Sequence, residues 1–378
     1  MTEVICTQLD HSKPMIMTKD VEPLLWRLYS LRAIEIKEYP SYDDRTYYVK
    51  TAPGGGIDGQ TEFILKVLNA QVTSQCPSVV SAQMDILNHM KKFPELKCQV
   101  PVATVDGKLL SYEMIPNVWN NGTAVRREDG LSAVRLFFFM QGQTLHDLAP
   151  LPLTFFYKAG RHIGNLQQAL QTFPGDIEPL KKKAAKYCWS FHNFPWVKRD
   201  FDVVKDVGRR ALVEDVVAEY QRMVVPMHGE LRKGVVDHDC NDCNILLTAQ
   251  PDDYEISGLI DFDELMYSFR VAEIAISISY WMQCSDEPLE VAAYSLAGFE
   301  SCAPLPQSER RLVRVLIAGR LVISLVYGLV ALKQQPDNDY LTTTQEKGWK
   351  CLELLWSQSQ QDLVKLWDQT RMQLQSQE

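Results

Sequence analysis

The sequence predicts an α+β protein with two lobes, a small strand-rich lobe over residues 1–142 and a larger, mainly helical lobe over residues 143–378. Two patterns carry this prediction. Segments in which polar and apolar residues alternate, as they do in half-buried strands, dominate the chain before residue 141. Long segments with apolar residues at helical spacing dominate from residue 153 onward.

In the N-terminal lobe, a leading helix is followed mainly by strands. Residues 19–31 carry apolar residues near the helical period, which predicts a helix. The glycine-rich residues 52–59 predict a flexible connection between two strands. Strands are predicted over 33–38, 45–51, 62–68, 102–105 and 109–115, and a second helix over 81–92. Residues 135–140 form a short apolar run that ends at Gln141-Gly142.

The second lobe is predicted to consist mainly of helices. Residues 155–171 carry a strong apolar stripe at helical spacing. The most apolar stretch, 312–332, is interrupted by Arg314 and Arg320, so it predicts a buried helix and not a membrane span. Further helices are predicted over 203–225, 271–284, 289–299 and 342–371.

Charge and cysteine usage restrict the classes of partner and compartment. The net charge is -9, from 39 basic and 48 acidic residues, which argues against a broad surface for nucleic acid. An acidic surface is compatible with small cationic substrates. We therefore expect small-molecule ligands, with neither nucleic acid nor membrane as a partner. The nine scattered cysteines and an N-terminus unlike a secretory signal predict reduced thiols and a cytoplasmic protein.

One stretch, residues 235–263, predicts phosphoryl-transfer chemistry. Asp239 lies five residues before Asn244, and Asp261 follows an apolar run seventeen residues after Asn244. These groups suit the orientation of an acceptor hydroxyl by Asp239 and the binding of Mg²⁺ through the oxygens of Asn244 and Asp261. The apolar segments 245–247 and 256–260 predict a hairpin that brings the two metal ligands to one end.

Two alternatives apply to this stretch. The first is an ordinary hairpin with carboxylates in its turns, although Asp261 directly follows an apolar strand, where a buried carboxylate needs a partner. The second is a redox or zinc site at Cys240 and Cys243. No second cysteine pair or histidine cluster in the sequence completes four ligands, so we interpret these cysteines as small loop residues.

Lys66 is the candidate phosphate ligand of the N-terminal lobe. It lies inside the apolar strand 62–68, where a buried ammonium group needs an anionic partner, and nucleotide phosphates would supply one. The alternative is a lysine whose stem reaches water. The residues 42–45 form a candidate turn over phosphates, and 135–142 form a candidate hinge whose backbone meets the nucleotide base.

These residues together resemble the aminoglycoside phosphotransferase and choline kinase family, whose members have a protein-kinase-like fold. Over most of the chain the resemblance is to the members that act on 5-hydroxylysine. The segments that carry this closer resemblance are 40–44, 62–66, 241–246, 257–262, 271–276, 296–300 and 347–350.

The resemblance implies an activity and a set of residue roles. The implied reaction transfers the γ-phosphate of GTP, or of ATP since the residues do not distinguish them, to the hydroxyl of 5-hydroxylysine. Asp239 is then the base, and Asn244 and Asp261 hold Mg²⁺. Lys66 meets the phosphates. The remaining implied positions are Phe138 and Phe139 at the nucleotide base, Asp263 and Glu264 at the acceptor amines, and Trp189 at the wall of the acceptor site. The alternatives are solvated turn charges for the two carboxylates and a core aromatic for Trp189.

The chain departs from the family at the start of the loop. Where the family has His-Gly-Asp, this sequence reads Asp237-His238-Asp239. A carboxylate at 237 close to other carboxylates is expected to raise one pKa, and any positive φ at His238 is costly. This departure leaves a nucleotide-binding pseudokinase as an alternative. A kinase of another amino alcohol is a further alternative, because it would share every motif.

Overall fold

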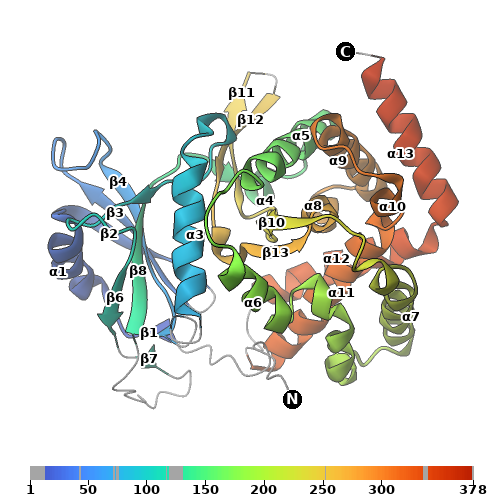
Figure 1. The fold of residues 1–378 in the computed structure, drawn as a ribbon, viewed down its shortest axis with the longest axis horizontal. Coiled ribbons are helices and arrows are strands. Elements are labelled where there is room, and N and C mark those ends of the chain that lie inside the picture. Colours follow the sequence, from blue (N-terminus) through green and yellow to red (C-terminus); the bar gives the residue numbers. More distant parts are fainter. Residues whose placement is uncertain are drawn as a thin grey trace. The chain divides into compact units, whose positions relative to one another are not determined.

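The computed structural model describes residues 13–41, 44–70, 73, 76–115, 117–118, 131–251, 253–334 and 339–376. The chain divides into two compact units. The N-terminal lobe comprises Ile5–Gln141 and Pro174–Pro179, and the helical lobe comprises mainly Gly142–Phe173 and Leu180–Glu378. The predicted α+β architecture with two lobes is confirmed (Figure 1). What each lobe binds stays a prediction.

The N-terminal lobe is built on an antiparallel sheet in the strand order β2-β3-β4-β8-β5, with β6 also paired to β8. Three of its strands were predicted almost to the residue. The strands are β2 (Ala33–Tyr39), β3 (Arg45–Thr51), β4 (Glu62–Val67), β5 (Pro101–Val102), β6 (Ser111–Met114) and β8 (Leu131–Phe138). A separate pair joins β1 (Lys13–Pro14) to β7 (Asn117–Val118).

Helices cover both faces of this sheet because its strands alternate apolar residues between the faces. On one face, α1 (Thr18–Tyr29) buries Leu25 against strand residues that include Phe63 and Val134. On the other face, Val80 of α3 (Pro77–Met90) packs on Ala133 of β8. The sheet thus holds Lys66 in its central strand β4.

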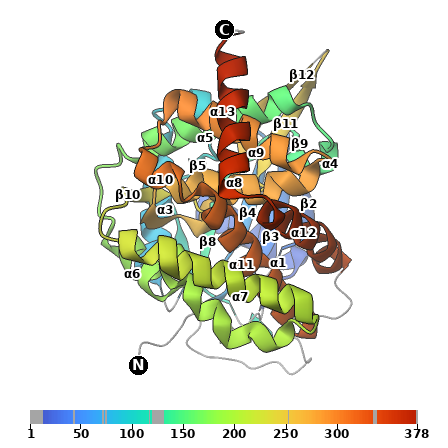
Figure 2. The ribbon, with the colours of Figure 1, turned by 90° about the vertical axis from the view of Figure 1, so that its right-hand side faces the viewer.

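In the helical lobe, α11 packs on α7, α8 and α12, and the strands form two small antiparallel sheets, β10-β13 and β12-β11-β9 (Figure 2). Its long helices are α5 (Leu153–Leu170), α6 (Glu178–Lys186), α7 (Val207–Met223), α8 (Val271–Trp281), α9 (Pro288–Cys302), α11 (Val313–Gln334), α12 (Asp339–Ser357) and α13 (Gln360–Gln375). Shorter helices are α4 (Leu145–Leu148), α10 (Gln307–Arg310) and the 3-10 helices η2 (Phe191–Val203) and η5 (Met282–Cys284). The strands are β9 (Gln143–Thr144), β10 (Lys233–Val236), β11 (Ile245–Gln250), β12 (Asp253–Leu259) and β13 (Met266–Phe269).

The apolar helix α11 lies within the bundle, as predicted from its interruption by arginines. Its segment Val313–Lys333 has a mean hydropathy of 2.3 and is long enough to cross a membrane. However, 67% of the most apolar window is buried inside the protein. It packs on α7, α8, α12 and η2, so its apolar side chains serve as core in this fold.

The helix predicted over 342–371 is two helices in the structure. The break lies at Ser359, whose hydroxyl accepts a hydrogen bond from the backbone N–H of Asp362 and caps α13. A serine followed three residues later by an acidic residue is a helix-start signal. The apolar residues at helical spacing continue across Ser359, so the pattern predicted a single helix.

Candidate active site

The hairpin formed by β11 and β12 places the two predicted metal ligands at the same end of paired strands. Ile245 pairs with Leu259 in the antiparallel register. Asn244 directly precedes β11, and its carbonyl accepts the N–H of Ile260 (3.0 Å). Asp261 follows Ile260 and takes a left-handed backbone conformation, with φ 61°. The predicted turn between the strands includes Asp252, which lies outside the described residues.

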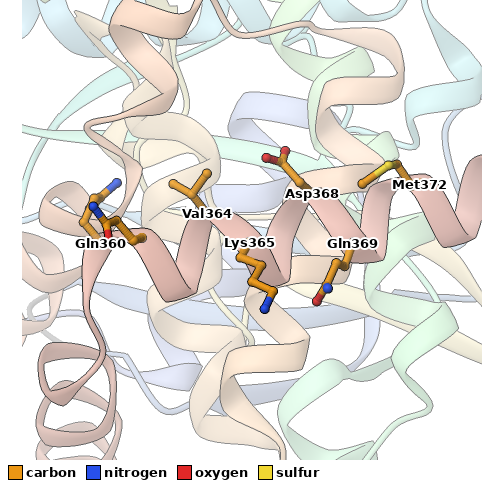
Figure 3. Close-up of a pocket in the computed structure, with 7 residues that line it drawn as sticks. Gln360, Val364, Lys365, Asp368, Gln369 and Met372 are labelled. Carbon is orange, nitrogen blue, oxygen red and sulfur yellow. The ribbon is translucent and has the colours of Figure 1, made fainter.

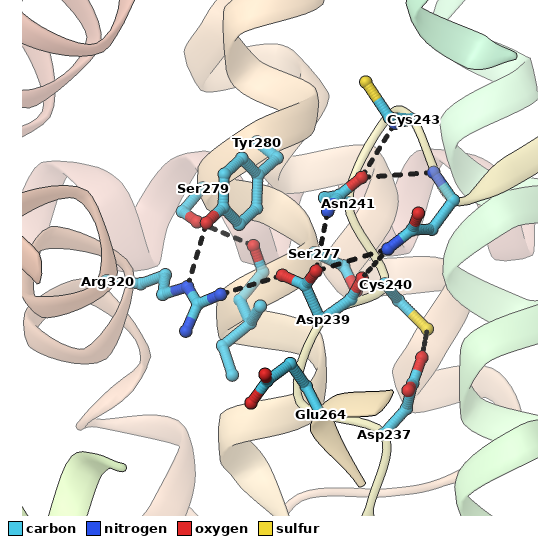
Figure 4. A network of polar contacts seen from close by, with 12 residues as sticks. Asp237, Asp239, Cys240, Asn241, Cys243, Glu264, Ser277, Ser279, Tyr280 and Arg320 are labelled. Carbon is cyan, nitrogen blue, oxygen red and sulfur yellow. Dashed lines mark hydrogen bonds and ion pairs between the residues drawn. The ribbon is translucent and has the colours of Figure 1, made fainter. Parts of the chain in front are cut away.

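The carboxylate of Asp239 is held in place by three neighbours (Figure 4). Its Oδ2 accepts hydrogen bonds from Asn241 Nδ2 (2.9 Å) and Asn244 Nδ2 (3.2 Å). Its Oδ1 accepts one from Arg320 Nη2 (2.8 Å). Asn241 Oδ1 in turn accepts the backbone N–H groups of Cys243 and Asn244, which fixes the loop. The predicted base therefore occupies one defined orientation.

The surroundings of Asp239 give it the proton affinity of a working base. Burial raises the pKa of Asp239 to about 7, the ion pair with Arg320 opposes this, and the carboxylates of Glu264, Asp261 and Asp242 raise it further. About 22% of the side chain is exposed, so the carboxyl group remains reachable. A general base works best when its pKa lies near the working pH.

Asn244 and Asp261 fit a hard divalent ion. The amide nitrogen of Asn244 donates to the backbone oxygen and to Oδ2 of Asp239. The nitrogen is thereby used within the loop, and the carbonyl oxygen is the atom of Asn244 suited to a cation. A carboxylate and an amide oxygen are the donor types that Mg²⁺ prefers.

Two carboxyl groups lie beneath the loop, at Asp237 and Glu273. Both are buried, and Glu273 Oε2 accepts the backbone N–H of Asp237 (2.8 Å). The Cys240 thiol donates to Asp237 Oδ2 (2.7 Å). Burial raises the pKa of Asp237 well above its usual value, and the neighbouring Glu273 adds to this. The pKa of Glu273 rises to about 7, also through burial. The expected effect of a carboxylate at 237 is therefore present.

His238 adopts the positive φ that the family's glycine would tolerate, with φ 71°. Its ring is fully buried, and neither ring nitrogen has a hydrogen-bond partner among the described residues. Burial lowers its pKa well below the usual value, so the imidazole is neutral. The departure from the family thus carries backbone strain and two unpaired polar atoms at the start of the loop.

The predicted acceptor residues lie on two segments of the helical lobe, with Asp263 and Glu264 in one 3-10 helix and Trp189 after α6. Glu264 is held by Tyr187 Oη (2.8 Å) and Lys183 Nζ (3.2 Å), and Lys183 Nζ also donates to the backbone oxygen of Asp263 (2.8 Å). The Trp189 ring lies 5.6 Å from the ring of Tyr327. Glu264 acts electrostatically on Asp239, so its carboxylate lies near the base.

Arg320 and Tyr280 are site residues that the sequence analysis did not identify. Arg320 projects from the middle of α11, pairs with Asp239, and donates through Nε to the Tyr280 hydroxyl (3.2 Å). Its guanidinium also lies over the ring of Trp189, 4.8 Å from the centroid. The available signal was an arginine inside an otherwise apolar helix, because a buried cation needs an anion.

In the N-terminal lobe, Lys66 is 7% exposed and lies opposite Arg135 of β8 in the sheet register. Arg135 is a second buried cation, which the sequence analysis assigned only to the hinge. The N–H of Phe138 donates to Val100 O and that of Phe139 to Glu62 O. Any hinge contact by these two phenylalanines would therefore use their other atoms. Of the predicted turn 42–45, Tyr42 and Asp43 lie outside the described residues.

Other groups and surfaces of the described chain fit a catalytic role less well. Cys240 and Cys243 are free thiols, as are five further cysteines, whereas Cys188 is disulfide-bonded, contrary to the expectation of reduced thiols.

A shallow depression runs along α13 (Figure 3). All its lining side chains come from that one helix, so it brings together no chemistry from different segments. They are Gln360, Gln361, Val364, Lys365, Asp368, Gln369 and Met372.

Known proteins resemble this chain over most of its length. The model of the phosphotransferase enzyme family matches residues 35–312. A hydroxylysine kinase from Danio rerio is 30% identical over 367 residues, covering 96% of this chain and 98% of the relative. One from Xenopus laevis is 29% identical over 372 residues, covering 96% of each. The resemblance to the kinases of 5-hydroxylysine is therefore confirmed.

Solved structures share the fold. Amicoumacin kinase hAmiN, in complex with AMP-PNP and Ca²⁺, has a TM-score of 0.65 at 12% identity and covers 92% of this chain and 97% of its own. A microcompartment-associated aminopropanol kinase has a TM-score of 0.64 at 16% identity, covering 90% and 96%. Together with the family model and the full-length relatives, these findings show that the chain belongs to the phosphotransferase enzyme family and is a small-molecule kinase that phosphorylates an alcohol group.

Proposed function

We propose that this protein transfers the γ-phosphate of GTP or ATP to the hydroxyl of 5-hydroxy-L-lysine, as a cytoplasmic enzyme of hydroxylysine breakdown. The observation that carries the proposal is the Asp239 carboxylate, which Asn244 and Arg320 hold in one orientation. The full-length relatives are hydroxylysine kinases, which supports the choice of acceptor.

The reaction needs one proton transfer and one phosphoryl transfer. The acceptor hydroxyl donates to Asp239, its oxygen attacks the γ-phosphorus, and the bond to the nucleoside diphosphate breaks. The hydroxyl proton passes to Asp239, whose pKa of about 7 suits it to accept a proton at neutral pH. A magnesium ion held by Asn244 and Asp261 would neutralise charge on the phosphates.

The nucleotide would be bound by the N-terminal lobe. Lys66 is buried in β4 and is our candidate for the phosphate ligand. The segment that ends β8 at Phe138, followed by Phe139, is the candidate hinge at the base. Hinge recognition works largely through backbone groups, so both GTP and ATP belong in the test.

The pseudokinase alternative has one specific observation in its favour, which is the strained and unpaired His238 beside Asp237. Against it, the hydrogen bonds among Asp239, Asn241, Cys243 and Asn244 hold the catalytic loop together despite this strain. The chain keeps the candidate base and both candidate metal ligands, which favours the active enzyme.

The test is steady-state nucleotide consumption by the purified protein with Mg²⁺. GTP and ATP are compared as donors, and 5-hydroxy-L-lysine is compared with lysine, choline and ethanolamine as acceptors. Lysine is the matched control, because it lacks only the hydroxyl. We expect consumption that requires hydroxylysine. Nucleotide binding without turnover on any acceptor would instead favour the pseudokinase, and turnover on choline or ethanolamine alone would favour a kinase of another amino alcohol.

A further inference from the structure

Arg320 is a buried cation attached directly to the proposed base. Its side chain is 3% exposed and projects from the middle of α11. One nitrogen, Nη2, donates to Asp239 Oδ1 (2.8 Å), and Nε donates to the Tyr280 hydroxyl (3.2 Å). Both contacts are drawn in Figure 4. A guanidinium fixed at two of its three nitrogens keeps a defined orientation.

Aromatic rings flank this guanidinium. Its central carbon lies 4.8 Å from the ring centroid of Trp189 and 5.3 Å from that of Tyr280. Aromatic faces of this kind attract the ammonium groups of ligands. Here the protein's own Arg320 takes that place beside the base, so an acceptor that presents only an ammonium group meets a cation of like charge.

The third nitrogen of Arg320 is a buried donor. Nη1 has no hydrogen-bond partner among the described residues. An unpaired buried donor costs about 1–3 kcal/mol, and in native proteins it usually marks an ion, water or ligand. The residues around it, Asp239, Glu264, Trp189 and Tyr280, are only partly buried. Nη1 itself is buried, so a ligand that bonds to it would pass between these partly exposed side chains.

We infer that Arg320 binds the carboxylate of the acceptor through Nη1 and so selects a hydroxy amino acid over an amino alcohol. This inference rests on the proposed function and deepens it, because it names the chemical group that the acceptor needs besides its hydroxyl. Planar guanidinium groups match carboxylates in geometry and charge.

The arrangement suits 5-hydroxylysine in particular. The acceptor hydroxyl bonds to Asp239, and Arg320 bonds to the same carboxylate. The distance from a ligand group bound at Nη1 to the acceptor hydroxyl is therefore about the length of one short side chain. In hydroxylysine three carbon atoms separate the hydroxyl-bearing carbon from the carboxyl carbon. The acceptor's amines then face Glu264, which Lys183 and Tyr187 hold in place.

A rival role for Arg320 is to position Asp239 alone. A positioning role would affect every acceptor equally, because all of them depend on the base. A carboxylate-binding role would affect only acceptors that carry a carboxylate. The two roles are therefore separated by a pair of acceptors that differ in that group.

The experiment measures kcat/KM for 5-hydroxy-L-lysine and for its decarboxylated analogue 1,5-diaminopentan-2-ol. Both acceptors are tested with the wild type, Arg320→Met and the matched control Arg314→Met. Arg314 lies on the same helix, stacks on Trp356 and donates to the backbone oxygen of Trp356, away from Asp239. We expect the wild type and Arg314→Met to prefer hydroxylysine by roughly 10- to 100-fold, the range of a hydrogen bond to a charged group. In Arg320→Met this preference should fall to about twofold or less, whatever the loss of rate common to both acceptors.

Each outcome decides between the possibilities. Equal use of the two acceptors by the wild type overturns the inference without any variant, while the kinase proposal stands. An unchanged preference in Arg320→Met also overturns it and leaves Arg320 as a positioning residue. If the wild type phosphorylates neither acceptor, the proposed function itself is wrong and the inference falls with it.

Discussion

At the scale of single residues, turnover depends most directly on Asp239. In Asp239→Asn the amide can still accept the hydrogen bond from Arg320, but it cannot take the proton of the acceptor. We expect kcat to fall by about 10²- to 10⁴-fold, the usual contribution of a general base. The affinity for nucleotide, measured by calorimetry, should change little. A variant that keeps the wild-type rate would show that Asp239 is not the base.

The buried carboxyl groups of Asp237 and Glu273 predict a pH dependence of stability. Burial raises both pKa values in the folded state, that of Glu273 to about 7. The folded chain therefore holds protons that the unfolded chain has released. Their stabilising contribution is complete below the unfolded pKa values, 3.8 for Asp237 and 4.5 for Glu273. It is lost as the pH rises through the folded pKa values, about 7 for Glu273 and well above the usual value for Asp237.

Asp237→Asn tests this dependence, because an amide stays neutral at every pH. We expect the free energy of unfolding of the variant, relative to the wild type, to increase between pH 5 and pH 8. Denaturant unfolding at several pH values measures it, with Asp286→Asn at an exposed position as the control. The comparison with the wild type also removes the opposite effect of the buried His238, whose lowered pKa destabilises the fold as the pH falls. A difference that does not vary with pH would contradict the prediction.

At the scale of elements, local patterns predicted the catalytic hairpin well. The spacing of Asn244 and Asp261 around β11 and β12 is a short-range feature, since each strand pairs with its neighbour along the chain. The strands β10 and β13 were missed because four residues show too little alternation to be recognised. The 3-10 helix η2 was missed for a related reason, because it lacks the period of an α-helix.

The ion pair between Asp239 and Arg320 could not be predicted from local pattern. The two residues are 81 positions apart, one in the loop after β10 and the other in α11, so only the tertiary fold brings them together. The sequence marked Arg320 as unusual, since it interrupts an apolar helix. It did not identify the anion, because several buried carboxylates were equally available along the chain.

The contact between α5 and α9 predicts a strong effect of one added methyl group. A Cβ on Gly298 would lie 1.9 Å from the backbone oxygen of Tyr157, and the facing Gly160 is equally crowded by Ser295. Gly298→Ala gains about 1 kcal/mol of helix propensity, but the clash is with backbone and forces the helices apart. We expect a net loss of about 2–4 kcal/mol in the free energy of unfolding.

Gly319→Ala in α11 is the matched control for this substitution. Its Cβ would meet the ring of Phe191 at an ordinary distance of 3.4 Å. We expect a change in stability within about 1 kcal/mol, of either sign. If both variants lose the same stability in denaturant unfolding, close backbone approach is not the reason for the glycine at 298.

At the scale of the whole molecule, the acidic net charge suits a cationic acceptor but not an anionic nucleotide. The net charge of -9 favours cationic acceptors over nucleic acid. A nucleotide brings the opposite charge, so its binding requires local cations and a metal. The N-terminal lobe by itself holds the buried cations Lys66 and Arg135. The helical lobe by itself holds the candidate metal ligands Asn244 and Asp261.

Magnesium and nucleotide together should therefore stabilise the whole chain against unfolding. Ligand at 100 times its Kd adds about 2.7 kcal/mol to the free energy of unfolding, which a thermal melt reports as a raised Tm. We expect the rise to be largely lost when EDTA removes the metal. Asp261→Ala should show a small rise even with Mg²⁺, because the metal has then lost one of its two candidate oxygen ligands. Asp239→Asn should show a ligand-induced rise as large as that of the wild type, although its Tm without ligand is lowered by the loss of the anionic partner of the buried Arg320. If the Tm of Asp261→Ala rises with ligand as much as that of the wild type, Asp261 does not belong to the metal site. Its carboxylate, which raises the pKa of Asp239, then has another role.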